Sequence, residues 1–443
     1  MKKPELNAAP PAEWTEQRIH RSAKQLFLYC FLAYGCSYIG RKNFAACLPA
    51  MLAEGLLTET VGGYITTAYM LLYGMGQLVS GLVAARVKPQ YMIGTGLLGA
   101  AICNACMGLV TEPWLMPVIW AGNGLFHSML WAPIIRVFTD RMPPDRRAWA
   151  GTNIVASCSI GAVLAFLIPS LVLRLSGWRV VFLVSGGILF FALLVWVVGH
   201  RFLRGYVRMM DEACRVEREA LRMMADAKAA AEHRKVKRSL PAVILASGLW
   251  FLLLCLFCNG ALRDGVETWA PTFLSASFGL DSSAAALIAV VIPLVSVSGT
   301  YTAEWIHKRF IRNEVYLCCL MFGITSLCVV GLYLSRHVHP LLCAVFMAVG
   351  VAAMWGVNHM FLTIIPYHFA PLGLSASVTG FLNSVIYFST ALCSGLYGAL
   401  AERLGWERLI FIWLGVGIVG AVFCVFGGLL WEKKRGALAS GDI

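Results

Sequence analysis

Two positive charges lie side by side in a stretch of sequence that is apolar enough to cross a membrane. The stretch "CSYIGRKNFAACLP" carries Arg41 and Lys42. A charge at the bilayer centre costs about 2.5–3.5 kcal/mol on insertion scales unless it faces water or a partner. A third cation, Arg263, lies in the later stretch "CNGALRDGVETWAPTFL". Because guanidinium groups pair with phosphate, sulfonate or carboxylate oxygens through two parallel hydrogen bonds, these residues indicate the binding of an anion.

The residues around Arg41 favour a hydrated pathway. Tyr38 and Tyr34, three and seven positions earlier, fall on the same face of a helix as Arg41. Arg41 comes 17 residues after Lys24, roughly 25 Å along a helix, so its side chain does not reach back to the cytoplasm. The alternative is that Arg41 and Lys42 reach the external surface, because the predicted span ends shortly afterwards.

Arg263 has acidic neighbours on its own helix. Asp264 is adjacent and Glu267 follows four residues later. Two arginines that approach from different spans repel each other unless a divalent or bulky anion lies between them. The alternative is neutralisation within the helix by Asp264 or Glu267, which leaves Arg41 unexplained.

The composition indicates a polytopic membrane protein. Of 443 residues, 59% are hydrophobic and only 13% are charged, which excludes a soluble enzyme of this length. Apolar runs of about 20 residues predict transmembrane helices, and the chain has twelve of them. They cover residues 25–52, 61–85, 90–110, 114–138, 148–172, 178–200, 241–274, 284–306, 313–335, 340–365, 373–400 and 408–431. The predicted fold class is an all-α integral membrane protein.

Membrane topology explains the net charge of +13. With the amino terminus inside, the cytoplasmic segments hold 28 of the 36 Lys and Arg residues and the outer loops hold five. This asymmetry is the positive-inside pattern. It predicts a multi-pass protein of the inner (plasma) membrane with both termini in the cytoplasm, and the charge requires no nucleic-acid partner.

A polar segment divides the predicted spans six and six. Residues 201–240 contain eleven Lys or Arg and six Asp or Glu, in a composition that favours helix. We interpret the segment as a cytoplasmic linker near anionic head groups rather than a regulatory or nucleic-acid surface. The predicted domains are a cytoplasmic tail (1–24), a first half (25–200), the linker (201–240), a second half (241–431) and a cytoplasmic tail (432–443).

The two halves echo each other in sequence. "RLSGWRVVFLV" precedes the sixth span and "RLGWERLIFIW" precedes the twelfth, at an offset of 229 residues. Pro49 follows Arg41 by eight residues, and Pro271 follows Arg263 by the same number. Repeats at nearly one offset predict two six-helix halves in a pseudo-twofold arrangement around a central pathway.

These motifs resemble the organophosphate:phosphate antiporter family of the major facilitator superfamily, which includes glycerol-3-phosphate and hexose-phosphate transporters. The resemblance rests on "YGCSYIGRKNFAACLP" (34–49), "RDGVETWAPTFL" (263–274) and "GLFHSMLWAPIIR", which ends at Arg136. It extends through nearly all twelve spans and implies the major facilitator fold. It also implies that Arg41 and Arg263 hold a phosphate moiety. Further residues implied to line the site are Lys42, Tyr34 and Tyr38.

The chain departs from the family pattern at several positions. Gln77 stands where the family has a lysine in the second span, Cys158 stands in place of a fifth-span histidine, and Ala85 replaces a loop acid. These changes leave the substrate and the gating contacts open.

Other polar and aromatic residues within the spans are candidates for the same site. We predict that the substrate also contacts His127, Trp131, Glu267, Asn358 and His359. Because imidazole titrates near neutral pH, each of the two histidines could carry a proton. For each histidine, and for the tryptophan, a packing role is the alternative.

The cysteines do not indicate a redox or metal site. Fourteen of fifteen lie in or at the edges of apolar spans, and the outer loops contain none, so we interpret them as packing residues. The sequence lacks a G-x-x-x-x-G-K-[ST] phosphate loop. We expect no cofactor, no metal and no enzymatic activity.

The sequence thus predicts a secondary transporter whose partners are small solutes and the lipid bilayer. We expect it to exchange an organic phosphate, or a similar small organic anion, for inorganic phosphate as a monomer. One rival function is a proton-coupled importer of carboxylates or sulfonates, with Glu267, Asp264 or His359 taking up the proton. A second rival is a transporter-like sensor of an anion.

Overall fold

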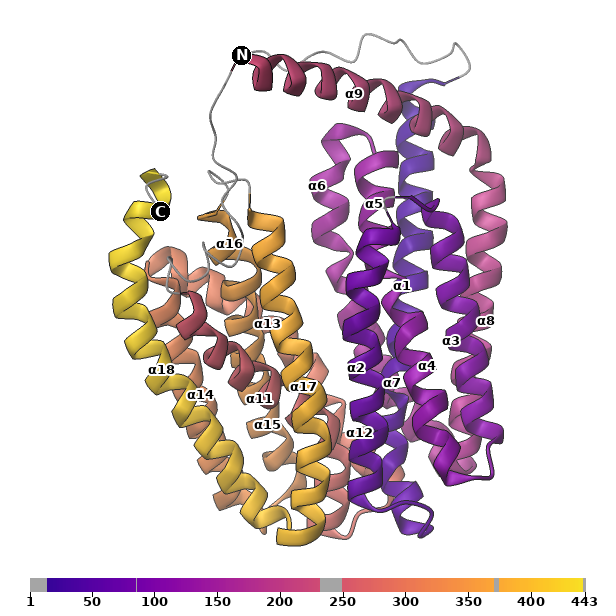
Figure 1. Cartoon of the computed structure of the whole chain (residues 1–443). Coiled ribbons are helices and arrows are strands. Elements are labelled where there is room, and N and C mark those ends of the chain that lie inside the picture. The colour runs from indigo at the N-terminus through magenta and orange to yellow at the C-terminus, as the bar shows by residue number, and fades with distance from the viewer. Residues whose placement is uncertain (1–13, 85, 232–248, 370–373, 441–443) are drawn as a thin grey trace.

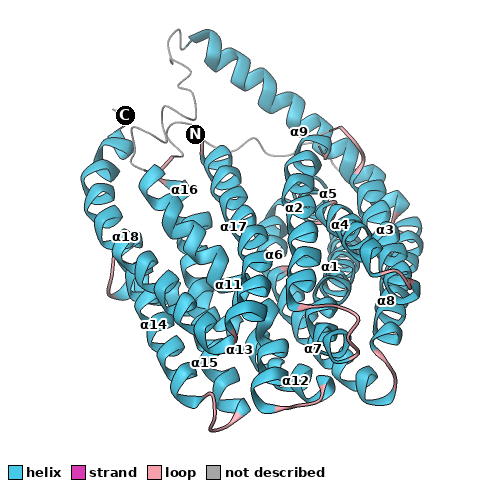
Figure 2. Ribbon diagram, turned by 60° about the horizontal axis from the view of Figure 1, so that its bottom comes forward, coloured by secondary structure: helices cyan, strands magenta, loops and turns pink. Residues whose placement is uncertain are grey.

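The computed structural model describes residues 14–84, 86–231, 249–369 and 374–440, and these residues form helices joined by short turns. The first bundle consists of α1 (Glu16–Ala53), α2 (Glu59–Val83), α3 (Pro89–Leu109), η1 (Pro113–Leu115), α4 (Met116–Ser128), α5 (Trp131–Arg141), α6 (Pro144–Asn153), α7 (Val155–Leu175) and α8 (Trp178–Phe202). The second consists of α11 (Leu249–Phe278), α12 (Ser282–Ala289), α13 (Val291–Arg309), α14 (Glu314–Ser335), α15 (Pro340–His359), η2 (Met360–Ile364), α16 (Ile365–Tyr367), α17 (Ser375–Leu404) and α18 (Trp406–Ser440). Figures 1 and 2 show the two bundles side by side, with α9 (Arg204–Ala231) at one end of the molecule.

The bundles contain the predicted spans. Nine helical segments of the described chain are long and apolar enough to cross a membrane, and four of them combine shorter helices, as in Pro113–Arg141 and Ser282–Arg309. Three further helices, α1, α2 and α11, have 38, 25 and 30 residues and pack within the same bundles. The predicted all-α membrane fold is therefore confirmed, and the described helices are consistent with twelve spans in two six-helix halves.

Polar caps define where several helices begin. The side chains of Thr15, Thr58, Asp281 and Asn313 accept hydrogen bonds from backbone N–H groups in the first turns of α1, α2, α12 and α14. Beyond the caps the segments are apolar, and a helix satisfies every backbone polar group in lipid from within the segment.

Prolines explain why some spans are broken. Pro133 follows the break between α4 and α5, Pro293 follows the break between α12 and α13, and Pro366 follows the π-helical turn η2. Proline has no N–H to donate and its ring collides with the carbonyl one turn earlier. The break between α4 and α5 lies directly before Trp131 and so sets the backbone direction beside the predicted site.

The two halves meet at the end of the molecule opposite α9. Where α2 crosses α17, the Thr67 hydroxyl donates to the Ala391 carbonyl at 2.7 Å. Where α7 meets α12, the Ser283 hydroxyl donates to the Ser170 carbonyl at 2.9 Å. Toward α9 the two bundles diverge (Figure 1). The two halves are therefore in contact at the end opposite α9, which is the closed end of the molecule.

The helix α9 is attached to the first half. Arg141 donates to both carboxylate oxygens of Asp211, at 2.7 and 3.2 Å, and its carbonyl accepts a hydrogen bond from the Tyr206 hydroxyl at 2.7 Å. Arg147 pairs with Glu217 at 2.8 Å. The beginning of the predicted 201–240 linker is thus docked on protein, while residues 232–240 lie outside the described structure. The domain boundaries stay a prediction.

A glycine in α17 permits the close crossing at the closed end. A Cβ atom added at Gly398 would lie 2.3 Å from the Glu59 carbonyl oxygen of α2. We expect Gly398→Ala to force the two helices apart and to lower the Tm by a few degrees, because overpacking costs about 1–3 kcal/mol. In a Thr66→Cys background, on the inner side of this crossing, the added thiol should then react faster with a membrane-impermeant maleimide.

The matched control is Gly415→Ala on α18, where nothing lies within 4 Å of the added atom. An unchanged Tm and unchanged labelling in Gly398→Ala would show that this crossing does not close the molecule.

Candidate functional site

A small cavity lies between the two halves, where α1 faces α11. Its free volume of about 40 Å³ holds a few water molecules, at roughly 10–15 Å³ each. From the first half it is lined by Arg41, Lys42, Phe44, Ala45, Thr66, Tyr69, Met70, Trp120 and Phe166, and from the second by Asp264, Glu267 and Thr268. Two cationic residues of the first half and two acidic residues of the second half therefore line one cavity.

Arg41 is held by aromatic rings rather than by a carboxylate. Its guanidinium lies 4.3 Å from the centre of the Tyr73 ring and 5.4 Å from that of Tyr38, in the range of cation–π attraction. Nη1 donates to the Tyr73 hydroxyl at 3.2 Å, whereas the buried Nε has no hydrogen-bond partner among the described residues. No Asp or Glu of the described chain forms an ion pair with Arg41. The positive charge of Arg41 is therefore open to an external anion.

Tyr73 links Arg41 to the position where the family pattern changes. The Tyr73 hydroxyl also accepts a hydrogen bond from Gln77 Nε2 at 2.8 Å. Its ring lies edge-on to Tyr387 of α17, with centroids 5.1 Å apart, so it also touches the second half. Sequence reasoning missed Tyr73 as a site residue, although it begins the "YGMGQ" stretch that contains Gln77.

Lys42 forms an ion pair across the two halves. Its ammonium group donates to Glu267 Oε1 on α11, although the two residues are 225 positions apart in sequence. Both side chains are largely buried, at 19% and 5% exposed. In this structure Glu267 thus neutralises Lys42, and it is not the partner of Arg263.

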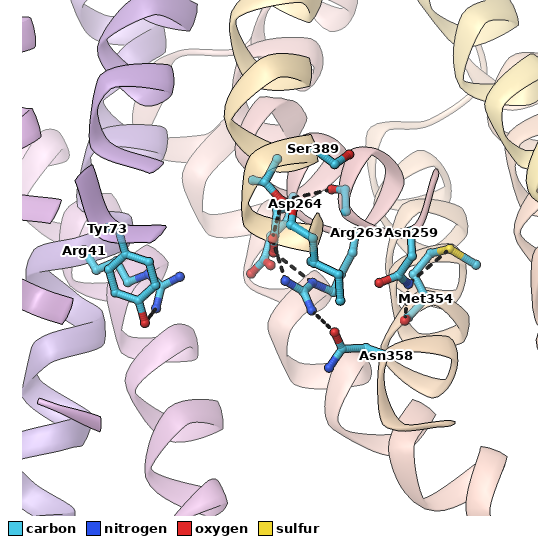
Figure 3. A network of polar contacts seen from close by, with 12 residues as sticks. Arg41, Tyr73, Asn259, Arg263, Asp264, Met354, Asn358 and Ser389 are labelled. Atoms are coloured by element: carbon cyan, nitrogen blue, oxygen red, sulfur yellow. Dashed lines mark hydrogen bonds and ion pairs between the residues drawn. The ribbon is translucent and has the colours of Figure 1, made fainter. Parts of the chain in front are cut away.

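Arg263 is neutralised within its own helix by Asp264. Its Nε and Nη2 atoms donate to the two Asp264 oxygens at 3.0 and 2.6 Å, and Nη1 donates to the Asn358 side-chain oxygen. The guanidinium lies 4.7 Å from the Trp355 ring centre, and Thr390 donates to Asp264 at 2.9 Å. The neutralisation that the sequence left as an alternative is realised for Arg263. Figure 3 shows this cluster in the second half and the Arg41–Tyr73 contact in the first.

Of the other predicted residues, Tyr34 and Trp131 pack beside Tyr38, and His127 lies between α4 and α1. Tyr34 packs against Tyr38 and Trp131, with ring centroids 5.6 and 5.1 Å apart, on the same helix as Arg41. His127 is 3% exposed, and its two ring nitrogens lie 2.9 Å from the carbonyls of Asn123 and Ser37. His127 therefore joins α4 to α1 in the packed interior, which agrees with the alternative packing role, and it is not among the residues that line the cavity.

His359 faces away from the Arg263 cluster. Its Nε2 atom lies 3.6 Å from Glu304 of α13, while its neighbour Asn358 contacts Arg263. Among the described residues there is no group of three or more His, Cys, Asp or Glu side chains placed to hold a metal ion. A role of these residues in substrate binding stays a prediction.

The open charge on Arg41 gives a direct binding test. We expect Arg41→Lys to weaken binding of inorganic phosphate roughly ten- to hundredfold, because ammonium keeps the charge but loses paired hydrogen bonds worth about 1.5–3 kcal/mol. Thermal shift of the purified protein against phosphate concentration measures this affinity. Arg336→Lys, which alters an arginine paired with Glu407 away from the cavity, is the control. Equal phosphate affinity in wild type and Arg41→Lys would remove Arg41 from the site.

Comparisons with known proteins agree with this architecture. The chain matches the family model of the Major Facilitator Superfamily over residues 30–390. Solved structures with the same fold include a bacterial homologue of the human lysosomal transporter Spinster, inward-facing and unoccupied (TM-score 0.74, 14% identity, covering 94% of this chain and 98% of that one). Another is the nucleoside transporter NupG (TM-score 0.68, 15% identity, covering 92% of this chain and 98% of that one).

Curated relatives carry names that fit the sequence resemblance. The glycerol-3-phosphate transporter of Bacillus subtilis is 25% identical over 435 residues, 93% of each chain. The phosphoglycerate transporter protein of Salmonella typhimurium is 22% identical over 442 residues, 96% of this chain and 94% of the relative. The membrane sensor protein UhpC of the same species is 26% identical over 316 residues, 70% of this chain and 69% of the relative. The resemblance seen in the sequence is confirmed by these relatives, and the chain belongs to the Major Facilitator Superfamily.

Proposed function

We propose that the protein exchanges an organic phosphate for inorganic phosphate across the inner (plasma) membrane by alternating access. The proposal rests on the environment of Arg41, which lines a cavity between the halves and has no carboxylate partner among the described residues. Relatives named as glycerol-3-phosphate and phosphoglycerate transporters supply the substrate class. We further propose that the protein acts as a monomer with both termini in the cytoplasm.

The charge on Arg41 gives a physical reason for coupling between binding and movement. An unneutralised cation in a closing cavity is costly because closure removes the water around it. A bound anion offsets that charge and stabilises the occluded state more than the open state, which is the condition for a ligand to shift a conformational equilibrium. Exchange for outgoing phosphate lowers the electrical cost of moving a negative solute into a negative interior.

The ion pair between Lys42 and Glu267 contributes to the same cycle. It joins α1 to α11 across the two halves, near the contacts that close the end opposite α9. Separation of the halves at this level requires that the pair is broken or exchanged for contacts with the ligand. Removing one partner of a buried ion pair costs about 3–5 kcal/mol. The pair therefore favours the observed state until an anion enters.

A second candidate function is an anion sensor. The relative UhpC, named as a membrane sensor protein, is 26% identical over 70% of this chain. A sensor uses the same cavity to bind the anion, but transmits occupancy to a partner without moving the ligand across the membrane.

Reconstitution separates these functions. Proteoliposomes loaded with phosphate are expected to take up glycerol 3-phosphate several-fold faster than liposomes loaded with chloride, and dissipating the pH gradient should not alter the rate. Liposomes containing Arg41→Lys protein serve as the matched control. Uptake that ignores internal phosphate and follows the pH gradient would replace exchange with proton coupling, and ligand binding without uptake would favour the sensor.

A further inference from the structure

The charges around the cavity form two closed pairs and one open cation. Lys42 pairs with Glu267, and Arg263 pairs with Asp264. Arg41 contacts tyrosine rings and a tyrosine hydroxyl instead. Counted over these five described residues, the formal charge is one positive unit, and it is located on Arg41.

Asp264 accepts hydrogen bonds from the side of the Arg263 guanidinium that could otherwise bind an anion. Both of its oxygens accept from the Arg263 fork, and Thr390 of α17 holds one of them from a second helix. Asp264 is also one of the residues that line the cavity. A ligand that enters beside Arg41 therefore meets a carboxylate, rather than a second free guanidinium, on the opposite wall.

Several charged or titratable groups surround Asp264. Arg41 and Lys42 of α1 and Arg263 of its own helix lie within electrostatic range of Asp264. Glu267 of the same helix and Tyr387 of α17 lie within electrostatic range of Arg263. Of these, Arg263 alone makes an ion pair with Asp264. The carboxylate is thus part of the charge balance that a ligand must complete.

We propose that Asp264 makes the site selective for organic phosphates that carry a single negative charge. This inference rests on the proposed function and names its substrate class. One negative charge placed on Arg41 completes a neutral set of three cations, two carboxylates and the ligand. A second negative charge is left uncompensated in a confined space beside Asp264 and Glu267, and an unpaired charge of this kind discriminates against the wrong ligand.

The preference for ligands with a single negative charge, which we call the charge rule, separates the substrates named for the relatives. Glycerol 3-phosphate is singly charged below its second phosphate pKa of about 6, and a large fraction of it remains singly charged near that pH. A phosphoglycerate has a carboxylate as well, with a reference pKa near 4, and so carries at least two charges above about pH 5. The wild-type protein is therefore expected to prefer glycerol 3-phosphate to 3-phosphoglycerate.

The test compares a titrating ligand with one of fixed charge on the purified full-length protein. Glycerol 3-phosphate should bind roughly 25-fold more weakly at about pH 7.5 than at about pH 5.5, following its singly charged fraction. Glycerol 3-sulfate keeps one negative charge at both pH values, and its affinity should change less than about twofold by the same reasoning. This second ligand also reports any effect of titrating His127, His359 or another protein group.

Substitution of Asp264 tests whether this residue causes the preference for singly charged ligands. In Asp264→Asn the site has one more positive charge, so the pH dependence for glycerol 3-phosphate should fall below about threefold and 3-phosphoglycerate should bind at least about tenfold more tightly. Thr390→Val removes the hydrogen bond to the same carboxylate without changing charge and should keep the wild-type pH profile. If Asp264→Asn does not fold, Glu267→Gln adds the same charge increment.

The outcomes distinguish the two proposals. If the wild-type protein binds glycerol 3-phosphate equally well or better at the higher pH, or prefers 3-phosphoglycerate, the charge rule is wrong while the proposed function stands. The same holds if Asp264→Asn and Glu267→Gln both keep the wild-type pH profile. If no organic phosphate and no inorganic phosphate binds to the wild-type protein, the proposed function itself is wrong.

Discussion

The architecture depends on a guanidinium group that lies within a membrane span and has no anionic partner in the part of the chain that the structure describes. Arg41 is placed by α1, flanked by the rings of Tyr73 and Tyr38, and faces a cavity that both halves line. Aromatic faces stabilise such a cation by about 0.5–2 kcal/mol, less than a buried carboxylate would, and they leave its hydrogen-bond donors for a ligand. An open charge of this kind is costly to retain, and the surrounding structure therefore has to balance every other charge nearby.

The second half supplies that balance. Asp264 and Asn358 hold Arg263 in place, and Glu267 reaches across to Lys42. Small side chains and glycines let α2 and α17 approach closely at one end, which brings the two charged helices α1 and α11 together. The cavity, the inter-half ion pair and the closed end are thus consequences of one packing arrangement.

The sequence was sufficient for the global organisation. Apolar runs of membrane length, a charged linker and two similar halves predicted twelve spans in a repeated arrangement, because each signal is local or recurs at a fixed offset. The choice of ion-pair partners among the charged side chains could not be predicted in the same way. Helical spacing offered Glu267 as a partner for Arg263, yet Glu267 contacts Lys42 from 225 positions away and the adjacent Asp264 takes Arg263. The contact of Tyr73 with Arg41, and the choice between the two roles considered for His127, likewise depend on helix contacts that one chain's sequence does not encode locally.

The most direct test of the central claim is a structure of the protein with glycerol 3-phosphate bound. We expect the phosphate oxygens to lie within hydrogen-bond distance of the Arg41 guanidinium, in the cavity between α1 and α11. A phosphate group bound elsewhere, with Arg41 still contacting only tyrosines, would contradict it.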